Sequence, residues 1–133
     1  GGLTGIEMAY DMVLSGKQVE VVEMKDSILG MDVVCAANGQ MLQQIIKYYH
    51  IPVHLSASID HFEEGKVYYT QDNTQHVIEC DTIISSIGYI SDNQLYDTLK
   101  DKYKDHIHLI GDSLQVSNLL GATWSAAELI QKL

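Results

Sequence analysis

Basic residues, proline, cysteine and long apolar runs are all scarce in this sequence of 133 residues. Eight Lys and Arg stand against 18 Asp and Glu, which gives a formal net charge of -10. A negative field of this size repels phosphate backbones and anionic lipid surfaces, so neither nucleic acid nor a membrane is an expected partner. No apolar run approaches the ~18 residues of a membrane span, and residues 1–15 lack the pattern of a signal peptide. We therefore expect a cytoplasmic protein.

The two cysteines and six histidines do not form a recognisable ligand or redox set. Cys35 and Cys80 stand alone without CxxC spacing, so we expect both to be small core residues. His106 and His108 would share one face of a strand, but no carboxylate or thiol at a suitable spacing joins them. The sequence therefore predicts no metal site.

Helical and strand-like patterns alternate along the chain, which is typical of an α/β fold. The length favours a single compact unit. Apolar spacing predicts a helix over 4–15 stopped by Gly16, a buried strand over 19–24, a helix over 40–49 and a strand over 53–56. We expect a Rossmann-like parallel sheet flanked by these helices.

The spacing of the apolar residues then changes to one typical of strands, which predicts an antiparallel meander of three strands between residues 58 and 80. Two near-continuous apolar stretches, TIISSIG at 82–88 and HIHLIGD at 106–112, predict further buried strands, with a short polar helix over 93–102 between them. A closing helix follows. Its expected buried face comprises Val116, Leu119, Leu120, Thr123, Ala126, Ala127 and Ile130.

The opening segment GGLTG has the spacing of the last two glycines of a GxGxxG dinucleotide fingerprint. Gly2 would let a diphosphate approach the backbone, and Gly5 would let helix and strand pack closely. The amides from Gly2 through Leu3 and Thr4 would then face the diphosphate at the positive end of the helix dipole. In this interpretation the first strand of the unit, and the first glycine, precede residue 1.

Glu23 supplies the second half of the pattern, because it ends the next predicted strand eighteen positions after Gly5. An acid near this offset accepts hydrogen bonds from the adenosine ribose and repels a 2′-phosphate. NADH is thus favoured over NADPH, although Lys25 nearby would tolerate a phosphate. A solvated strand end is the alternative interpretation of Glu23.

These residues carry a family resemblance over nearly the whole chain. GGLTGIEMAYDMVLSGKQVEVVE, CDTIISSIGYISDNQLYDTL and HIHLIGD together resemble the NAD(P)H-binding region of FAD/NAD(P)-dependent pyridine nucleotide oxidoreductases. GYISDNQLYDTL looks most like the old yellow enzyme-type NADH:flavin oxidoreductases, the enoate reductase and dienoyl-CoA reductase group. Many members of that group have Pro-Asn where this chain has Asp92-Asn93.

The resemblance implies a nicotinamide-binding module that positions NADH for hydride transfer to FAD or FMN in a longer parent chain, and that is inactive alone. It divides the chain into an NAD(P)H-binding domain at 1–104 and the end of an FAD-binding domain at 105–133. The remaining flavin domains are then partners, and a homo-oligomer stays open. In a doubly wound sheet the absent first strand would leave unpaired backbone groups in the interior, so we expect HIHLI at 106–110, or a second chain, to fill its slot.

The resemblance adds five candidate site residues. It places Glu7 near the nicotinamide, a strand-end turn beside the cofactor, and Asp112 at the flavin; the turn comprises Ile87, Gly88 and Tyr89. From the residues alone, Glu7 could equally be an exposed helix residue, and Asp112 the cap of the last helix. Two other functions stay open: a domain of a pyridine nucleotide-disulfide oxidoreductase or NADH oxidase, and a non-catalytic nucleotide-sensing module.

Overall fold

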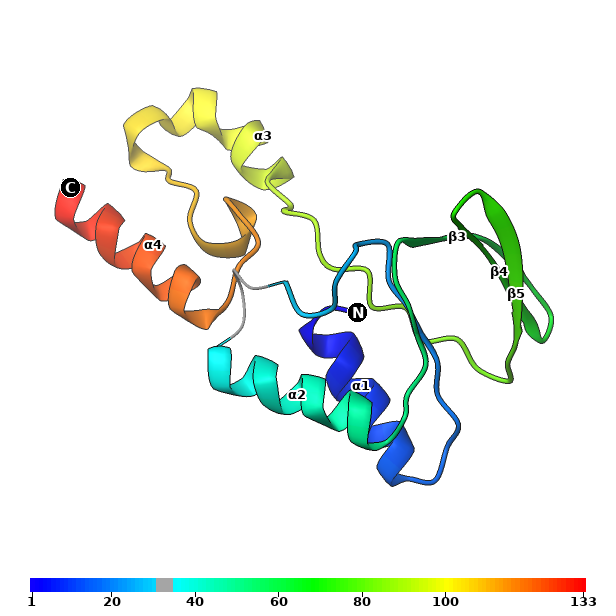
Figure 1. Ribbon diagram of the computed structural model, residues 1–133. Helices are drawn as coiled ribbons and strands as arrows, with labels where there is room; N and C mark the ends of the chain where they lie inside the picture. Colours follow the sequence, from blue (N-terminus) through cyan, green and yellow to red (C-terminus); the bar gives the residue numbers. More distant parts are fainter. Residues whose placement is uncertain (31–34) are drawn as a thin grey trace. The chain divides into compact units, whose positions relative to one another are not determined.

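The computed structural model describes residues 1–30 and 35–133 (Figure 1). It divides them into two compact units, Gly1–Ile87 and Gly88–Leu133. The expectation of a single unit is therefore wrong. The physical reason is that every buried apolar side chain among the described residues belongs to the first unit. The boundary of the two compact units falls at 87/88. The predicted division at 104/105, with the assignment of 105–133 to the end of an FAD-binding domain, stays a prediction.

Helix α1, Leu3–Leu14, begins directly after Gly2 and buries Ile6 and Ala9. It ends where the sequence predicts, because Gly16 takes a left-handed φ of +76°. That turn lets the Lys17 amide donate back to the Met12 carbonyl at 3.0 Å, which satisfies a carbonyl that the helix end would otherwise leave free.

A short parallel sheet follows, formed by β1 (Val21–Val22) and β2 (Val53–His54). The Glu23 amide donates to the His54 carbonyl at 2.9 Å, and the Ala57 amide donates to the Glu23 carbonyl at 3.0 Å. These bonds continue the pairing past the last strand residue and fix the backbone of Glu23. The parallel sheet of the predicted fold is therefore confirmed, with strands shorter than the apolar pattern suggested.

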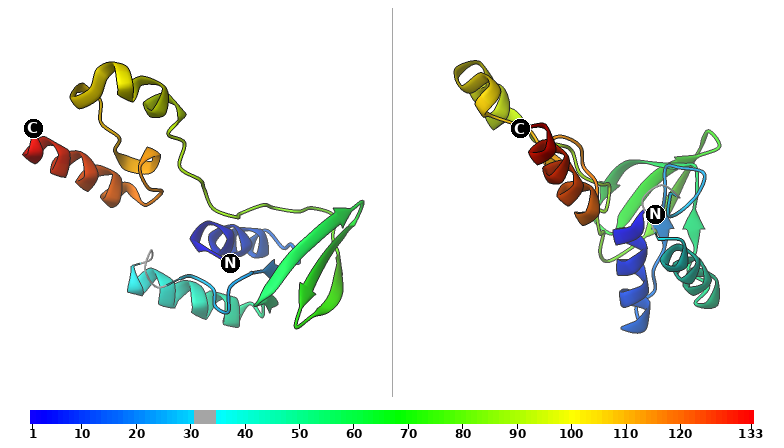
Figure 2. Two further views of the ribbon diagram at one scale, coloured as in Figure 1. Left: turned by 90° about the horizontal axis from the view of Figure 1, so that it is seen from above. Right: turned by 90° about the vertical axis from the view of Figure 1, so that its left-hand side faces the viewer.

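Helix α2, Ala36–Tyr48, connects the two parallel strands and lies beside α1 (Figure 2). Its Leu42 and Ile46 are buried. The two helices and the sheet enclose one apolar cluster, made of Ile6, Ala9, Val21, Leu29, Leu42, Ile46 and Ile51. This cluster holds the start of α1 and the end of β1 in place, and those are the two elements that carry the predicted binding residues.

The predicted meander is confirmed as β3 (Ala57–Glu63), β4 (Lys66–Gln71) and β5 (Thr74–Glu79), paired antiparallel. Asp72 and Asn73 both have positive φ, 50° and 59°. Such a two-residue turn matches the right-handed twist of the strands that it joins. Tyr69 of β4 is only 4% exposed, because it lies on the inner face of this sheet.

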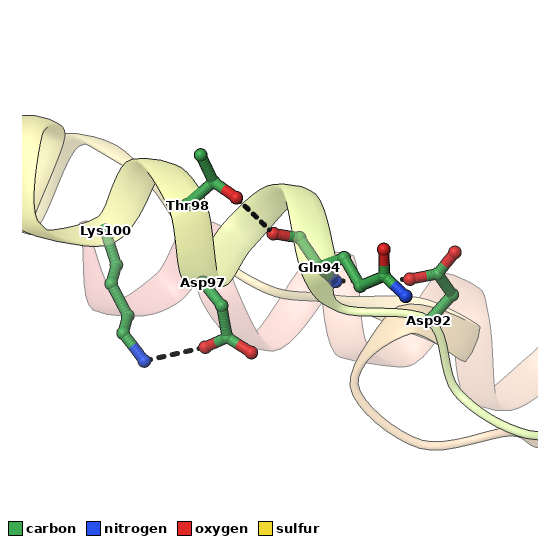
Figure 3. A network of polar contacts seen from close by, with 5 residues as sticks. All are labelled: Asp92, Gln94, Asp97, Thr98 and Lys100. Atoms are coloured by element: carbon green, nitrogen blue, oxygen red, sulfur yellow. Dashed lines mark hydrogen bonds and ion pairs between the residues drawn. The ribbon is translucent and has the colours of Figure 1, made fainter.

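The second unit contains α3 (Gln94–Tyr103), two short 3-10 turns, η1 (Lys104–His106) and η2 (Gly111–Ser113), and α4 (Leu119–Lys132). Polar contacts fix α3 (Figure 3): the Gln94 amide donates to Asp92 Oδ1 at 3.1 Å, and Lys100 Nζ lies 2.6 Å from Asp97 Oδ1. Asn118 caps α4 by accepting the Gly121 amide at 2.9 Å. Both helices were predicted.

Two predicted strands are wrong. Residues 82–88 and 106–112 form no strand, and 106–110 pairs with no strand in the part of the chain that the structure describes, so it fills no slot in the parallel sheet. Ile87 is 94% exposed. Apolar, β-branched composition favours extended backbone, but a strand also needs a partner to satisfy its amides and carbonyls. These segments have none among the described strands.

Two predictions of buried residues are also wrong. The expected inner face of α4 is open: Leu119 is 88% exposed, and no residue of this helix is buried. Cys35, expected in the core, is exposed at the start of α2, and Cys80 is partly buried. The spacing correctly gave the helix, but burial also depends on which elements lie against that helix.

Candidate functional site

The site begins at the N-terminus of α1, where backbone amides have no side-chain cap. Gly2 is the N-cap residue, and the first backbone bond into the helix runs from the Ile6 amide to the Gly2 carbonyl at 3.0 Å. The amides of Leu3, Thr4 and Gly5 find no acceptor among the described residues. Three free donors at the positive end of a helix dipole favour an anion.

The three opening glycines face different surroundings. Nothing lies within 4 Å of the position that a Cβ would take at Gly2. A Cβ at Gly5 would lie 3.3 Å from Ser86 Oγ, and one at Gly1 would lie 2.7 Å from Glu23 Oε2. Gly2 therefore leaves open space before the amides, whereas Gly1 and Gly5 admit neighbouring side chains. Sequence reasoning missed the roles of Gly1 and Ser86.

Glu23 lies beside this glycine segment. Its Oε2 is 2.8 Å from the nitrogen of Gly1, and its Oε1 accepts the Lys25 backbone amide at 2.8 Å. The side chain is 15% exposed. Burial raises the pKa of Glu23, but hydrogen bonds from the Gly1 nitrogen and the Lys25 backbone amide, with the charge of Lys25, bring that pKa below its ordinary value of 4.5. The carboxylate is therefore ionised at neutral pH.

The backbone on both sides of Glu23 is held by the neighbouring loops. The Leu29 amide donates to the Gly1 carbonyl at 2.9 Å, and the Ser56 amide donates to the Lys25 carbonyl at 2.8 Å. The structure therefore places Glu23 against Gly1, the residue before the N-cap Gly2. Joint binding of a dinucleotide by Gly2, Gly5 and Glu23 stays a prediction. The side chain of Lys25 is exposed on the same loop.

A polar network ties the parallel sheet to the meander. His54 Nε2 lies 2.8 Å from Glu20 Oε2, and His54 Nδ1 lies 3.0 Å from the Tyr69 hydroxyl. Tyr69 also stacks on His76, with ring centroids 5.1 Å apart. No sequence pattern predicts this network, since three of its residues come from β2, β4 and β5 and the fourth, Glu20, lies just before β1.

The other predicted residues lie as follows. Leu3 is partly buried against the core, whereas Thr4 and Glu7 are exposed on α1. Ile87 ends the first unit, and the second unit begins with Gly88, whose φ is +88°, and the exposed Tyr89. Their contacts with a cofactor stay predictions.

Asp112 belongs to the second unit and has a local partner. Its Oδ1 accepts the Ser117 amide at 3.2 Å, just before α4. That bond supports a role in shaping the approach to the helix, although Asn118 is the residue that caps it. The flavin contact of Asp112 stays a prediction.

Helix α1 and strand β1, with open amides at the start of the helix and an ionised acid beside that start at the end of the strand, have the arrangement of a Rossmann-like nucleotide-binding unit. Comparison with known proteins gives the family. Residues 1–118 match the pyridine nucleotide-disulphide oxidoreductase family, and the chain belongs to that family. The family is one of FAD- and nicotinamide-dependent oxidoreductases, so the protein belongs to an enzyme family.

Among relatives, the cinnamate reductase of Clostridium sporogenes is 36% identical over 135 residues, covering all of this chain and 20% of the relative. A solved structure of 2-naphthoyl-CoA reductase shares the fold with a TM-score of 0.80 at 20% identity, again covering all of this chain and 20% of the other. An FAD-dependent pyridine nucleotide-disulphide oxidoreductase from Desulfovibrio vulgaris matches 73% of this chain and 25% of its own, with a TM-score of 0.55 and 27% identity.

Three facts follow from these matches and from the helices. The fold is that of a Rossmann-like flavoprotein, as predicted. The chain spans only a fifth to a quarter of the length of these relatives. No helix among the described residues is long and apolar enough to cross a membrane.

Proposed function

We propose that this chain is the nicotinamide dinucleotide-binding module of a flavin-dependent NADH oxidoreductase, and that it positions NADH for hydride transfer to a flavin. One observation carries the proposal. The Glu23 carboxylate lies 2.8 Å from the Gly1 nitrogen, directly beside the uncapped start of α1. This adjacency supports the proposal, because a dinucleotide needs hydrogen-bond donors for its diphosphate next to an acid for its sugar.

The residues fit the group that they would hold. The amides of Leu3, Thr4 and Gly5 would donate to the diphosphate, and the open space at Gly2 gives it room to approach the backbone. Glu23 would accept hydrogen bonds from the ribose hydroxyls. When bound, the nicotinamide supplies a hydride, and the reactive atoms belong to the cofactors. The chain's own contribution is to bind and orient.

NADH is favoured over NADPH because Glu23 is held ionised. Its lowered pKa keeps a negative charge where a 2′-phosphate would lie, and like charges at close range destabilise binding. Lys25 is the opposing group, and its side chain is exposed. We therefore expect weaker binding of NADPH, not its complete exclusion.

The parent protein is proposed to be an old yellow enzyme-type reductase of the enoate reductase and dienoyl-CoA reductase group. The 36% identity to cinnamate reductase over the whole chain supports this. On this proposal, residues 105–133 end an FAD-binding domain in which Asp112 contacts the flavin. The remaining flavin domains are then partners, the protein is cytoplasmic, and the 133-residue stretch alone is inactive.

Calorimetric titration of the 133-residue chain with NADH and NADPH tests the proposal. We expect NADH to bind more tightly, and Glu23→Gln to weaken NADH binding about tenfold or more, because a charge-assisted hydrogen bond is worth about 1.5–3 kcal/mol. Glu79→Gln, on the exposed edge of β5, is the matched control and should leave affinity unchanged. Negligible heats with both nucleotides would refute the proposed function.

A further inference from the structure

Strand β5 forms one edge of the antiparallel meander, and its outer side pairs with no strand among those that the structure describes (Figure 1). In an antiparallel sheet, the amides and carbonyls of successive residues point alternately to the two sides of the strand. The Cys80 amide donates to the Gly65 carbonyl at 2.9 Å, so the even-numbered residues of this segment face β4. The backbone groups of Gln75, Val77 and Glu79 therefore point outward, where another strand can pair with them.

The β5 edge lacks the features by which proteins commonly protect an exposed strand. Lysine, proline and β-bulges are such features, and the six residues TQHVIE pair with β4 without an irregularity and contain neither lysine nor proline. The opposite edge differs, because β3 has a register shift between Ile59 and His61 and its Ala57 amide is bonded to the Glu23 carbonyl. β5 is therefore the edge of this sheet that is open to a further strand.

The sequence of β5 is complementary to itself when two copies run antiparallel. Outward-facing backbone groups can bond only to outward-facing groups, which restricts the register to pairs of odd-numbered residues. Of these registers, the one centred on Val77 pairs all three outward-facing residues. It places Val77, which is 52% exposed in the single chain, against its equivalent. It also places Gln75 opposite Glu79 of the second copy, so an amide can donate to a carboxylate and no like charges oppose each other.

We propose that β5 is a homodimer interface, at which two copies of this chain join their three-stranded meanders into one continuous antiparallel sheet. The inference is independent of the proposed function, because no candidate cofactor-binding residue belongs to β5. Each copy has a net charge of -10, so the copies repel each other until salt screens their charges. One strand from each copy is a small contact, and we therefore expect a weak dimer.

Sedimentation equilibrium measures the association in about 0.5 M salt, where the Debye length is only a few Å, with protein from about 1 μM to about 1 mM. Two lysine variants change the net charge equally but should act in opposite directions. Val77→Lys puts two cations opposite each other and should weaken the dimer about tenfold or more. Gln75→Lys puts a cation opposite Glu79 of the other copy and should strengthen the dimer about threefold.

Single cysteines test the register directly, in a background that carries Cys35→Ser and Cys80→Ser. Val77→Cys places two thiols at opposed positions, where the Cα atoms lie about 5.5 Å apart and a disulfide can form. Gln75→Cys is the matched control, because its two copies are offset along the strands by about 14 Å. Under mild oxidation we expect a crosslinked dimer from Val77→Cys alone. Urea unfolding verifies that each variant is folded, and if Val77→Lys is not, the cysteine pair decides.

The outcomes separate clearly. A wild-type mass that rises toward twice that of the monomer, with crosslinking of Val77→Cys alone, supports the interface. A wild-type chain that stays monomeric at the highest concentration overturns it. Equal crosslinking of both cysteine variants also overturns it, as does a dimer that responds alike to both lysine variants, because the contact then lies on another surface. The nucleotide titrations bear on the proposed function alone.

Discussion

Replacing Gly2 with alanine should remove most of the affinity for NADH while leaving the fold intact. Nothing lies within 4 Å of the added Cβ, and the residue has an ordinary extended backbone, with φ -72° and ψ -178°. Alanine is a poorer N-cap than glycine, which costs about 1 kcal/mol at most. The methyl group, however, would stand in the space through which the diphosphate reaches the amides.

The size of the expected loss of affinity follows from the hydrogen bonds between the α1 amides and the diphosphate. Loss of one hydrogen bond to a charged phosphate costs about 1.5–3 kcal/mol, which corresponds to roughly 10- to 150-fold weaker binding. Calorimetric titration measures the affinity, and urea unfolding verifies the fold. Ser15→Ala, at the opposite end of α1, is the control. If Gly2→Ala binds NADH as tightly as wild type, the amides of α1 do not hold the diphosphate and the reasoning fails.

Two further predictions concern stability. Because the pKa of Glu23 lies below 4.5 in the folded chain, its ionised form stabilises the fold above about pH 4.5, and this contribution is lost as pH falls through the folded pKa. The difference in unfolding free energy between wild type and Glu23→Gln should therefore shrink from pH 7 to pH 3 in urea titrations; a constant difference would contradict it. His54→Ala should lower the unfolding free energy by about 1–3 kcal/mol, since it leaves the buried Tyr69 hydroxyl without its partner. His61→Ala, at an exposed site, should cost less than about 1 kcal/mol, and equal losses would show that the His54 network adds nothing.

The elements that sequence predicted well are those whose signals are local. Helix α1 combines an apolar stripe with Gly16 as its stop, and the meander has turn residues at Gly65 and at Asp72-Asn73. These signals depend on residues close together in the sequence, so they predict the element whatever the tertiary packing around it. The segments 82–88 and 106–112 have equally strong apolar composition, yet a strand is a property of two segments, and composition says nothing of the second.

The residues of the candidate site also fall into those that the sequence predicts and those that it does not. Gly2, Gly5 and Glu23 could be found because a fingerprint fixes their spacing along the chain. Gly1 and Ser86 could not, because their significance lies in what they touch. The Gly-Gly pair at the start was visible, but only the fold shows that the first of the two makes room for a carboxylate 22 positions further along.

The contact between residue 1 and residue 23 makes their sizes interdependent. A methyl group at the first position would stand 2.7 Å from a glutamate oxygen and 2.9 Å from its Cβ. Among homologous proteins, a bulkier residue at the first position should therefore accompany a shorter or neutral one at the second. On the proposed function, such paired exchanges would mark lineages that have changed how they recognise the adenosine sugar.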